Sequence, residues 1–201
     1  PKISEVKMTA VCDIDPVALK TATETFDVPG FANATDLINS GLVDAVLIAT
    51  PHYFHAPIAV EAMKAGLHVI SEKPMTVQLS EADKMIQAAK ETGKTFGVMF
   101  QQRCLPEVQA AYKIIKEGRL GEIRRTMLID AHFRSQAYYD SATWRATWRG
   151  EGVGVLMNQG PHGMDLFVWL GGLPSRVTAQ CATRQHRIEV EDEALAIVNY
   201  P

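Results

Sequence analysis

Four short apolar runs in the first half of the chain each end in polar or charged residues that could bind a ligand. These endings are Cys12-Asp13, Thr50-Pro51-His52, Ser71-Glu72-Lys73-Pro74 and Gln101-Gln102-Arg103. If the runs are parallel strands of one sheet, their carboxyl ends meet at one edge, which is where open α/β sheets bind ligands. One or two polar endings arise readily by chance, whereas four in succession favour a binding site.

Lys73 carries the most specific chemistry among these residues. It lies between an apolar run and Pro74, in the sequence LHVISEKP. On a rigid turn at the edge of a sheet, a lysine ammonium could hydrogen-bond a substrate hydroxyl and lower the pKa of that hydroxyl. The simpler alternative is a surface ion pair with Glu72, and the bond from Lys73 to Pro74 could be cis or trans.

Asp13 suggests a dinucleotide cofactor. In dinucleotide-binding folds an acidic residue accepts hydrogen bonds from the ribose hydroxyls, about 20 residues after a glycine-rich phosphate loop. Asp15 stands directly before Pro16 and is the better cap for the next helix, which leaves Asp13 for this role. Its carboxylate would repel a ribose phosphate, which favours NAD over NADP. No G-x-G-x-x-G occurs in the sequence, so the loop would lie before Pro1.

The elements that must position these residues alternate regularly as far as Gly118. Apolar runs predict strands at 6–13, 44–50, 67–70 and 95–100, and apolar stripes predict helices near 16–26, 55–65, 80–93 and 106–118. Strands that alternate with helices of this length form right-handed βαβ units and a parallel sheet. Near-continuous apolar strands such as 44–50 are typical of strands buried on both faces.

A different pattern begins after Gly121. It predicts a longer strand at 122–133, an aromatic-rich polar stretch at 135–152, a helix at 153–171 and strands at 175–184 and 194–200. Neighbouring strands without a helix between them indicate an antiparallel or mixed sheet. We therefore predict two domains, 1–103 with an α/β fold and 104–201 with an α+β fold.

The composition is that of a soluble globular protein. Of the 201 residues 47% are hydrophobic and 21% are charged, and the net charge of −3 argues against nucleic acid as a partner. The apolar runs are shorter than the roughly 20 residues of a membrane-spanning helix. Cys12, Cys104 and Cys181 form neither a disulfide framework nor a zinc pattern. We expect buried thiols, a cytoplasmic protein and no bound metal.

Both ends of the chain suggest that it belongs to a longer protein. It begins with Pro1 inside the repeating pattern and stops at Tyr200-Pro201, directly after an apolar run. We expect the first strand and phosphate loop before Pro1, and more of the C-terminal sheet beyond Pro201. The chain by itself is then expected to bind NAD weakly and to be inactive.

Several longer motifs occur in a fixed order. They are Glu72-Lys73-Pro74, preceded by AxxAGxHV at 62–69 and by Thr50-Pro51 with His55; KEGRLGEI at 116–123; Trp144-Arg145; and G-x-G-x-L-x-x-x-G-x-H-x-x-D from Gly152 to Asp165. Together they resemble the glucose–fructose oxidoreductase and inositol dehydrogenase family (Gfo/Idh/MocA), over essentially the whole chain. The resemblance implies a Rossmann-type parallel sheet, here incomplete, followed by an α+β domain with a mostly antiparallel sheet.

The resemblance also implies roles for individual residues. Lys73 matches the lysine that contacts nicotinamide and substrate and assists proton transfer, and His162 matches the catalytic histidine, a candidate general base. Asn158 stands where many members carry an aspartate that positions the substrate. The implied cofactor contacts are Asp13, Thr50, Pro51, His55, Glu72, Lys73, Gln101, Trp144 and Arg145. The implied substrate contacts are Arg103, Tyr138, Asn158, Gln159 and His162.

Two residues depart from the family's pattern. Val153 replaces the middle glycine of a glycine run, and Asn158 holds no charge, although an amide can still orient a hydroxyl. We interpret Asn158 as a clue to the substrate. Tyr138, Tyr139 and Trp148 either line a sugar pocket or pack together. The simplest interpretations elsewhere are satisfied loop histidines at His52, His68, His132 and His186, and a solvated turn at 189–193.

The leading hypothesis is an NAD-dependent oxidoreductase that takes hydride from a secondary hydroxyl of a sugar, cyclitol or related polyol. A neutral imidazole with a pKa of about 6.5 suits removal of the hydroxyl proton at neutral pH. One alternative is an enzyme that retains NAD and uses transient oxidation for glycoside cleavage or epimerisation. Another is a cofactor-binding regulator without catalysis, against which the presence of both Lys73 and His162 argues. A homo-oligomer is implied for the full-length protein.

Overall fold

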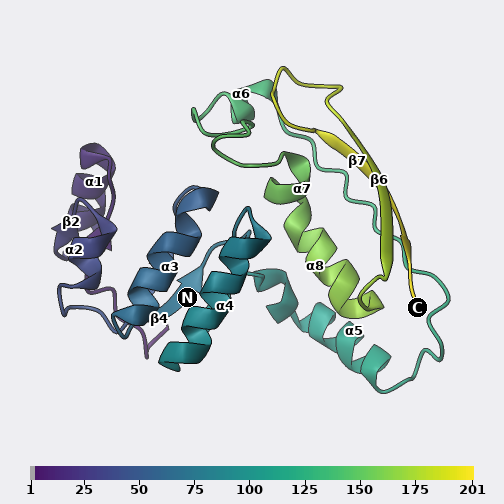
Figure 1. The fold of residues 1–201 in the computed structure, drawn as a ribbon, viewed down its shortest axis with the longest axis horizontal. Coiled ribbons are helices and arrows are strands. Elements are labelled where there is room, and N and C mark those ends of the chain that lie inside the picture. The colour runs from purple at the N-terminus through teal and green to yellow at the C-terminus, as the bar shows by residue number, and fades with distance from the viewer. Residues whose placement is uncertain (1–2) are drawn as a thin grey trace. The chain divides into compact units, whose positions relative to one another are not determined.

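The computed structural model describes residues 3–201, which form two compact units. The first contains the residues up to Thr50 together with 54–72 and 78–97. The second contains 51–53, 73–77 and 98–201 (Figure 1). Each unit is considered by itself, and the division into domains at 103 and 104 stays a prediction.

Short strands and helices alternate along the first unit. Its elements are β1 (Val11–Cys12), α1 (Pro16–Phe26), β2 (Gly30–Phe31), α2 (Ala34–Ile38), β3 (Ala45–Ile48), α3 (His55–Lys64), β4 (His68–Ser71), α4 (Leu79–Thr92) and β5 (Phe96–Val98). β1 pairs with β2 in parallel, and β3 pairs with β4 in parallel. Because β4 lies between β3 and β5, these strands form a three-stranded sheet. The predicted α/β class is confirmed, but the predicted strand at 6–13 is reduced to the residues of β1.

Local signals account for the ends of the helices. The Asp15 side chain accepts a hydrogen bond of 2.8 Å from the backbone N–H of Val17, and Pro16 occupies the first turn of α1, as predicted. Gly93 ends α4 in the left-handed region, with φ +65°. α4 begins at Leu79, one residue before the predicted start.

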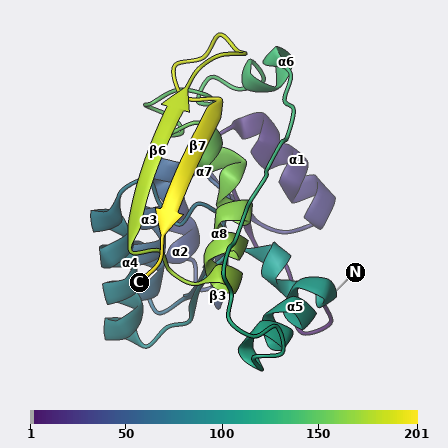
Figure 2. The same cartoon turned by 90° about the vertical axis from the view of Figure 1, so that its right-hand side faces the viewer.

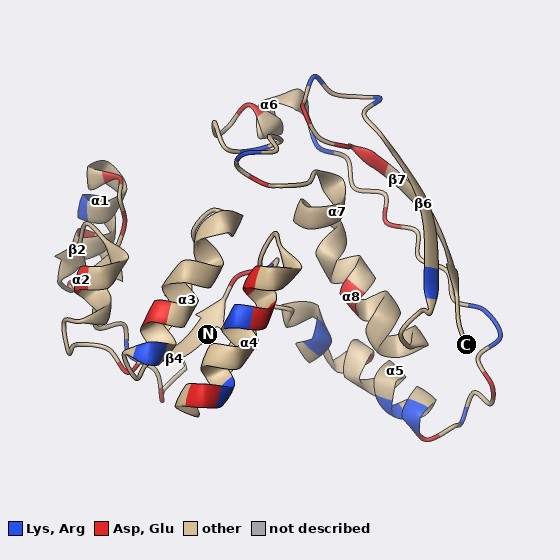
Figure 3. Cartoon of the chain, viewed as in Figure 1, with Lys and Arg blue, Asp and Glu red and all other residues tan. Residues whose placement is uncertain are grey.

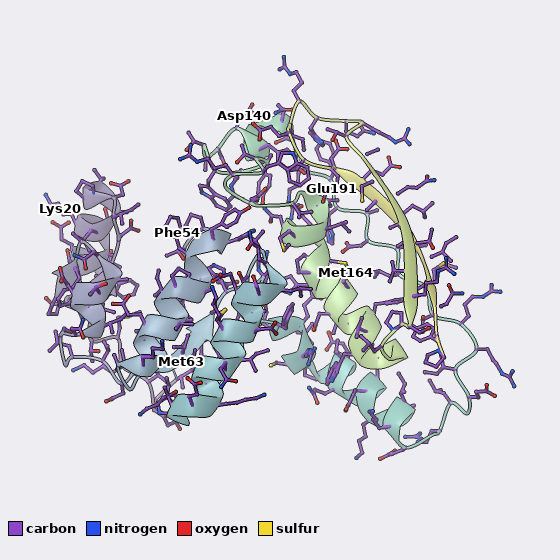
Figure 4. The ribbon with its side chains drawn as sticks, viewed as in Figure 1. Lys20, Phe54, Met63, Asp140, Met164 and Glu191 are labelled. Atoms are coloured by element: carbon purple, nitrogen blue, oxygen red, sulfur yellow. The ribbon has the colours of Figure 1, made fainter. Side chains whose placement is uncertain are left out.

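The core of the first unit lies between α3 and its neighbours. Ala59 and Met63 of α3 are fully buried, as is Met85 of α4. Figure 4 labels Met63 on α3. α3 packs against β3, β4 and α4. Leu47 and Ile70 point away from this core and are 62% and 45% exposed. The expectation that the strand at 44–50 is buried on both faces is therefore wrong for the described residues, because the packed helices cover one face.

The second unit combines helices with an antiparallel pair of strands. Its elements are η1 (His52–Phe54, shared with the first unit), η2 (Gln101–Cys104), α5 (Pro106–Lys116), α6 (Gln136–Tyr139), α7 (Val155–Asn158), α8 (Gly160–Gly171), β6 (Arg176–Ala182) and β7 (Glu193–Asn199). β6 and β7 run in opposite directions (Figure 2), with Arg176 opposite Asn199. α8 packs against α5 and η2. The antiparallel arrangement of the last two strands is confirmed.

The predicted strand at 122–133 is wrong. These residues form no helix or strand, and most of them are exposed. A strand needs a ladder of hydrogen bonds to a neighbour, and β6 and β7 pair only with each other among the described residues. The segment is attached by side chains instead, as in the 3.1 Å hydrogen bond between the Thr126 and Tyr200 hydroxyls.

The predicted helix at 153–171 is divided into α7 and α8, with Gln159 between them. Pro161 in the first turn of α8 lacks a backbone N–H and so favours a new helix start there. α8 is uncharged apart from Asp165 (Figure 3). The break separates Asn158, at the end of α7, from His162, in the first turn of α8.

The cysteines differ from expectation. Cys12, Cys104 and Cys181 are all exposed and free. The prediction of buried thiols is therefore wrong, and it followed only from the frequent burial of unpaired cysteine in other proteins.

Candidate active site

A cavity of about 860 Å³ in the second unit is lined by several of the residues that could do chemistry. Its lining includes Lys73, Tyr138, Asn158, Gln159 and His162. The segment from 120 to 134 and one side of α8 supply much of the rest of the wall. The sequence motifs at 72–74 and 152–165 thus contribute side chains to one cavity.

Lys73 reaches the end of α7. Its Nζ donates a hydrogen bond of 2.7 Å to the backbone carbonyl of Asn158. The last carbonyls of a helix have no partner within the helix and carry partial negative charge, so a lysine ammonium is stabilised there. The peptide bond between Lys73 and Pro74 is cis.

α7 is held at its start by the side chain of Glu191. The carboxylate is 7% exposed and accepts hydrogen bonds of 2.9 Å from the N–H of Gly154 and 3.1 Å from that of Leu156 (Figure 4). Asp192 beside it accepts the N–H groups of Arg184, Gln185 and His186. The prediction of a solvated turn at 189–193 is therefore wrong, because these carboxylates satisfy backbone donors that would otherwise lack partners.

Glu151 is the residue that the sequence reasoning missed. Its side chain is 1% exposed, and one carboxylate oxygen accepts a 2.7 Å hydrogen bond from the N–H of Ala146. The other oxygen accepts a hydrogen bond from Nδ2 of Asn158. Burial raises the pKa of Glu151, although these hydrogen bonds and the charges of Arg145 and Lys73 oppose the shift. A glutamate inside the glycine-rich stretch EGVG is the only sequence signal that could have marked it.

Tyr138 connects Asn158 to Arg145. Its hydroxyl lies 3.4 Å from Oδ1 of Asn158 and accepts a 2.9 Å hydrogen bond from Nη1 of Arg145. Nε2 of Gln159 lies 3.4 Å from the same hydroxyl. The Arg145 guanidinium also stacks on the rings of Tyr138 and Trp144, at 4.6 and 4.8 Å from their centres. Trp144 and Arg145 themselves lie outside the cavity lining.

The neighbouring aromatic residues divide between cavity, core and surface. Tyr138 lines the cavity, whereas Tyr139 is buried in a small core with Ala146 and Val190. Trp148 is 55% exposed and outside the cavity lining. Of the aromatic residues predicted for a sugar pocket, the structure therefore places only Tyr138 in the cavity.

Arg103 lies outside the cavity lining, whereas its neighbour Gln102 is part of that lining. Its guanidinium forms an ion pair with Asp165 of α8, which raises the pKa of Arg103, and lies 5.1 Å from the centre of the Trp169 ring. Gln101 is exposed in η2. The pair of Arg103 and Asp165 connects η2 to α8, so the motif residue Asp165 has a structural partner.

The first unit holds most of the remaining predicted cofactor residues. Asp13 is exposed at the end of β1, and its Oδ1 accepts a 2.9 Å hydrogen bond from the N–H of Asp15. His55 is fully buried, with Nε2 2.9 Å from the carbonyl of Thr50. Glu72 follows directly after β4. Pro51 belongs to the second unit, beside His52, whose Nδ1 lies 3.0 Å from the carbonyl of Glu151.

Polar groups also lie beside three further histidines. His68 accepts the N–H of Thr95, His132 lies against Asp130, and His186 lies between Asp192 and the carbonyl of Arg134. Residues 3–201 contain no group of three or more His, Cys, Asp or Glu that could hold a metal ion. Within the same residues, every helix is too short or too polar to cross a membrane.

Comparison with known families covers nearly the whole chain. Residues 2–100 match the model of the oxidoreductase family with an NAD-binding Rossmann fold, and residues 108–201 match the Gfo/Idh/MocA C-terminal domain. The chain belongs to the Gfo/Idh/MocA family of oxidoreductases. The predicted family and fold class are thereby confirmed.

Individual curated proteins are also similar to this chain. The chain is 32% identical to the uncharacterized oxidoreductase YdgJ of Escherichia coli over 82% of this chain and 46% of YdgJ. It is also 32% identical to inositol 2-dehydrogenase of Corynebacterium glutamicum, over 83% of this chain and 47% of that protein. The chain thus spans about half the length of these curated relatives.

A solved structure of a Gfo/Idh/MocA relative agrees closely with this chain. The WlbA dehydrogenase from Bordetella pertussis, in complex with NADH and UDP-GlcNAcA, superposes with a TM-score of 0.92. The sequence identity is 36%, and the match covers 96% of this chain and 60% of WlbA. The likeness extends over both units of the chain.

Proposed function

We propose that the protein is an NAD-dependent oxidoreductase that transfers hydride from a secondary hydroxyl of a sugar, cyclitol or related polyol to nicotinamide. The observation that carries this proposal is the meeting of Lys73, Asn158 and His162 at one cavity in a chain of an NAD-binding oxidoreductase family. A lysine, an amide and an imidazole together can orient a hydroxyl and remove its proton.

The residues proposed to hold the cofactor have suitable chemistry. Asp13 is exposed, and one of its oxygens accepts the N–H of Asp15, so the second oxygen can accept from a ribose hydroxyl. The other proposed contacts are Thr50, Pro51, His55, Glu72, Lys73, Gln101, Trp144 and Arg145. When bound, NAD would supply the acceptor for the hydride. The protein residues supply binding, orientation and proton transfer.

Lys73 and His162 divide the proton handling. The Lys73 ammonium donates to the substrate hydroxyl oxygen and stabilises the negative charge that develops there. Neutral His162 takes the hydroxyl proton as hydride leaves the carbon, so the alcohol loses one proton and one hydride and becomes a ketone. The bond from Lys73 to the Asn158 carbonyl holds the ammonium beside the end of α7. Asn158 and Tyr138 orient the other substrate hydroxyls.

A sugar-sized substrate suits the cavity. A volume of about 860 Å³ lies within the usual range of small-molecule sites, and Tyr138 offers a ring on which a sugar could stack. Two relatives support this class, since one is named inositol 2-dehydrogenase and the other was solved with UDP-GlcNAcA.

The proposed activity predicts formation of NADH with a subset of sugars and polyols. The full-length protein is incubated with NAD and a panel of cyclitols, aldoses, sugar acids and nucleotide sugars, while reduced nicotinamide is followed by its absorbance. At least one compound is expected to give steady reduction and a ketone product. Conversion of a compound without NADH accumulation would indicate a closed redox cycle instead. Cofactor binding without conversion of any compound would favour a regulator.

Asp13 is predicted to set the preference for NAD over NADP. Asp13→Asn keeps an oxygen for the N–H of Asp15 but removes the charge that would repel a ribose phosphate. We expect the ratio of kcat/KM for NADP to that for NAD to rise roughly tenfold, since one like-charge contact near a surface contributes on the order of 1–4 kcal/mol. Asp15→Asn is the matched control, because asparagine caps helices equally well. An unchanged ratio in Asp13→Asn would remove Asp13 from the cofactor site.

A further inference from the structure

We propose that Glu151 is a positioning residue that fixes the orientation of the Asn158 amide in the cavity. The proposal rests on the proposed function for its catalytic consequence, but its geometric basis is independent of that function. Glu151 itself lies outside the cavity lining, whereas Asn158 and Tyr138 lie within it. Its effect on a substrate would therefore pass through those two side chains.

The four side chains form a hydrogen-bond chain with one direction. Arg145 donates to the Tyr138 hydroxyl at 2.9 Å, and that hydroxyl donates to Oδ1 of Asn158 at 3.4 Å. Nδ2 of Asn158 donates to the Glu151 carboxylate. A guanidinium can only donate and a carboxylate can only accept, so the two charged ends determine the direction of every bond between them. Glu151 is the acceptor that ends the chain.

The direction of this hydrogen-bond chain cannot reverse when Glu151 is lost as the acceptor. The Tyr138 oxygen receives the N–H of Arg145 and lies near that of Gln159, so it has no suitable site for a third donor from a rotated Asn158 amide. Asn158 therefore depends on Glu151 for the direction of its amide. Its backbone carbonyl is also the acceptor for Lys73, so a disturbance at residue 158 reaches the lysine.

The surroundings of Glu151 make this acceptor both necessary and sensitive to protonation. The side chain is 1% exposed, and the N–H of Ala146 donates to its second oxygen. The charged groups that face it are Lys73 and Arg145, and His52 contacts its backbone carbonyl. Burial raises the pKa of Glu151 against these charges. Protonation would remove the charge and place an O–H on one of the two oxygens that now accept from Ala146 and Asn158, which weakens the end of the hydrogen-bond chain.

Glu151→Gln tests the proposal at constant size. Both Ala146 and Asn158 donate to this residue in the wild type. In either orientation of the glutamine amide, its NH₂ group, which is a donor, would therefore face one of these donors. We expect kcat to fall about 10- to 100-fold, as for one unsatisfied buried group, with a smaller change in KM. The fall in kcat at acidic pH that results from protonation of Glu151 should be absent in this variant.

Asn158→Asp in the Glu151→Gln background supplies the rescue. The new carboxylate accepts from both the glutamine amide and the Tyr138 hydroxyl, so all donors are satisfied again. We expect the double variant to recover kcat to within roughly threefold of the wild type. Asn158→Asp alone places two carboxylates in contact and should lose activity as they ionise. A double variant no better than Glu151→Gln would overturn the proposal.

A measurement without substrate separates this proposal from the proposed function. The side-chain NH₂ signals of Asn158, assigned by their absence in Asn158→Asp, are followed by NMR from acidic to neutral pH. The chemical shifts of these signals are expected to change as Glu151 is protonated in the wild type and to stay constant with pH in Glu151→Gln. Asp192→Asn is the control, since this carboxylate is also buried but accepts its hydrogen bonds from the N–H groups of Arg184, Gln185 and His186. Asn158 signals that titrate equally in Glu151→Gln would contradict the proposal, whatever the activity of the enzyme.

Discussion

Lys73→Ala is expected to lower kcat by about two to four orders of magnitude while the protein stays folded. The magnitude follows from the usual contribution of a positioned acid or base, which corresponds to about 3–5 kcal/mol in the activation free energy. The Lys73 ammonium donates to the Asn158 carbonyl at the cavity. Loss of this ammonium removes the group proposed to stabilise the developing alkoxide. The measurement is kcat and KM for the substrate found in the screen.

Two further variants make the Lys73 result specific. Lys73→Arg keeps the positive charge but has a larger, planar head that cannot take the position of the ammonium, so we expect little recovery of kcat. Lys113→Ala removes an exposed lysine that faces Glu117 on α5 and should leave kcat unchanged. Thermal unfolding of Lys73→Ala should stay close to that of the wild type. If Lys73→Ala retains more than a third of the wild-type kcat, the lysine has no part in proton handling.

Features of the fold that depend on neighbouring residues in the sequence were predictable. The cap of α1 at Asp15 and Pro16 follows from the residue types alone, and the structure contains the expected bond to Val17. The alternation of β3, α3, β4 and α4 follows from apolar periodicity in the same way. These signals are local, because a cap or a stripe involves residues within one or two turns of each other.

Features that depend on a partner far along the chain were not predictable. The stretch 122–133 has the composition of a strand, but a strand requires backbone hydrogen bonds to a neighbouring strand, and among the described residues β6 and β7 pair only with each other. Glu191 stands in an acidic stretch typical of a solvated turn. Its burial follows from the N–H groups of Gly154 and Leu156, more than 30 residues earlier in the chain. No local pattern contains that information.

The candidate site shows the same division. Motifs identified Lys73, Asn158 and His162, and all three line one cavity. Arg103 was expected to contact substrate, yet its guanidinium pairs with Asp165, outside the cavity lining. Glu151 was missed because its significance lies in its contact with Asn158 and in its burial. A glutamate in a glycine-rich loop is ordinarily solvated, and only the fold distinguishes this one.

His162→Ala is expected to lower kcat by about two to four orders of magnitude, through loss of the proposed general base. The residue lies in the first turn of α8 and lines the cavity, with its ring 6.1 Å from that of Phe100 in an edge-to-face arrangement. Since a neutral imidazole must take the proton, the wild-type rate should fall toward acidic pH, where a protonated ring could not act as the base. The variant should lack that limb, as measured by kcat between pH 5 and 9.

Chemical rescue distinguishes loss of the base from loss of structure. Alanine at residue 162 leaves room beside Phe100, so added imidazole should restore part of kcat in proportion to its neutral form. His68→Ala is the control, because that exposed histidine belongs to the first unit, where its ring accepts the N–H of Thr95. A His162→Ala enzyme that is inactive, folded and insensitive to imidazole would assign His162 to substrate positioning. One that retains activity within threefold of the wild type would exclude His162 as the general base.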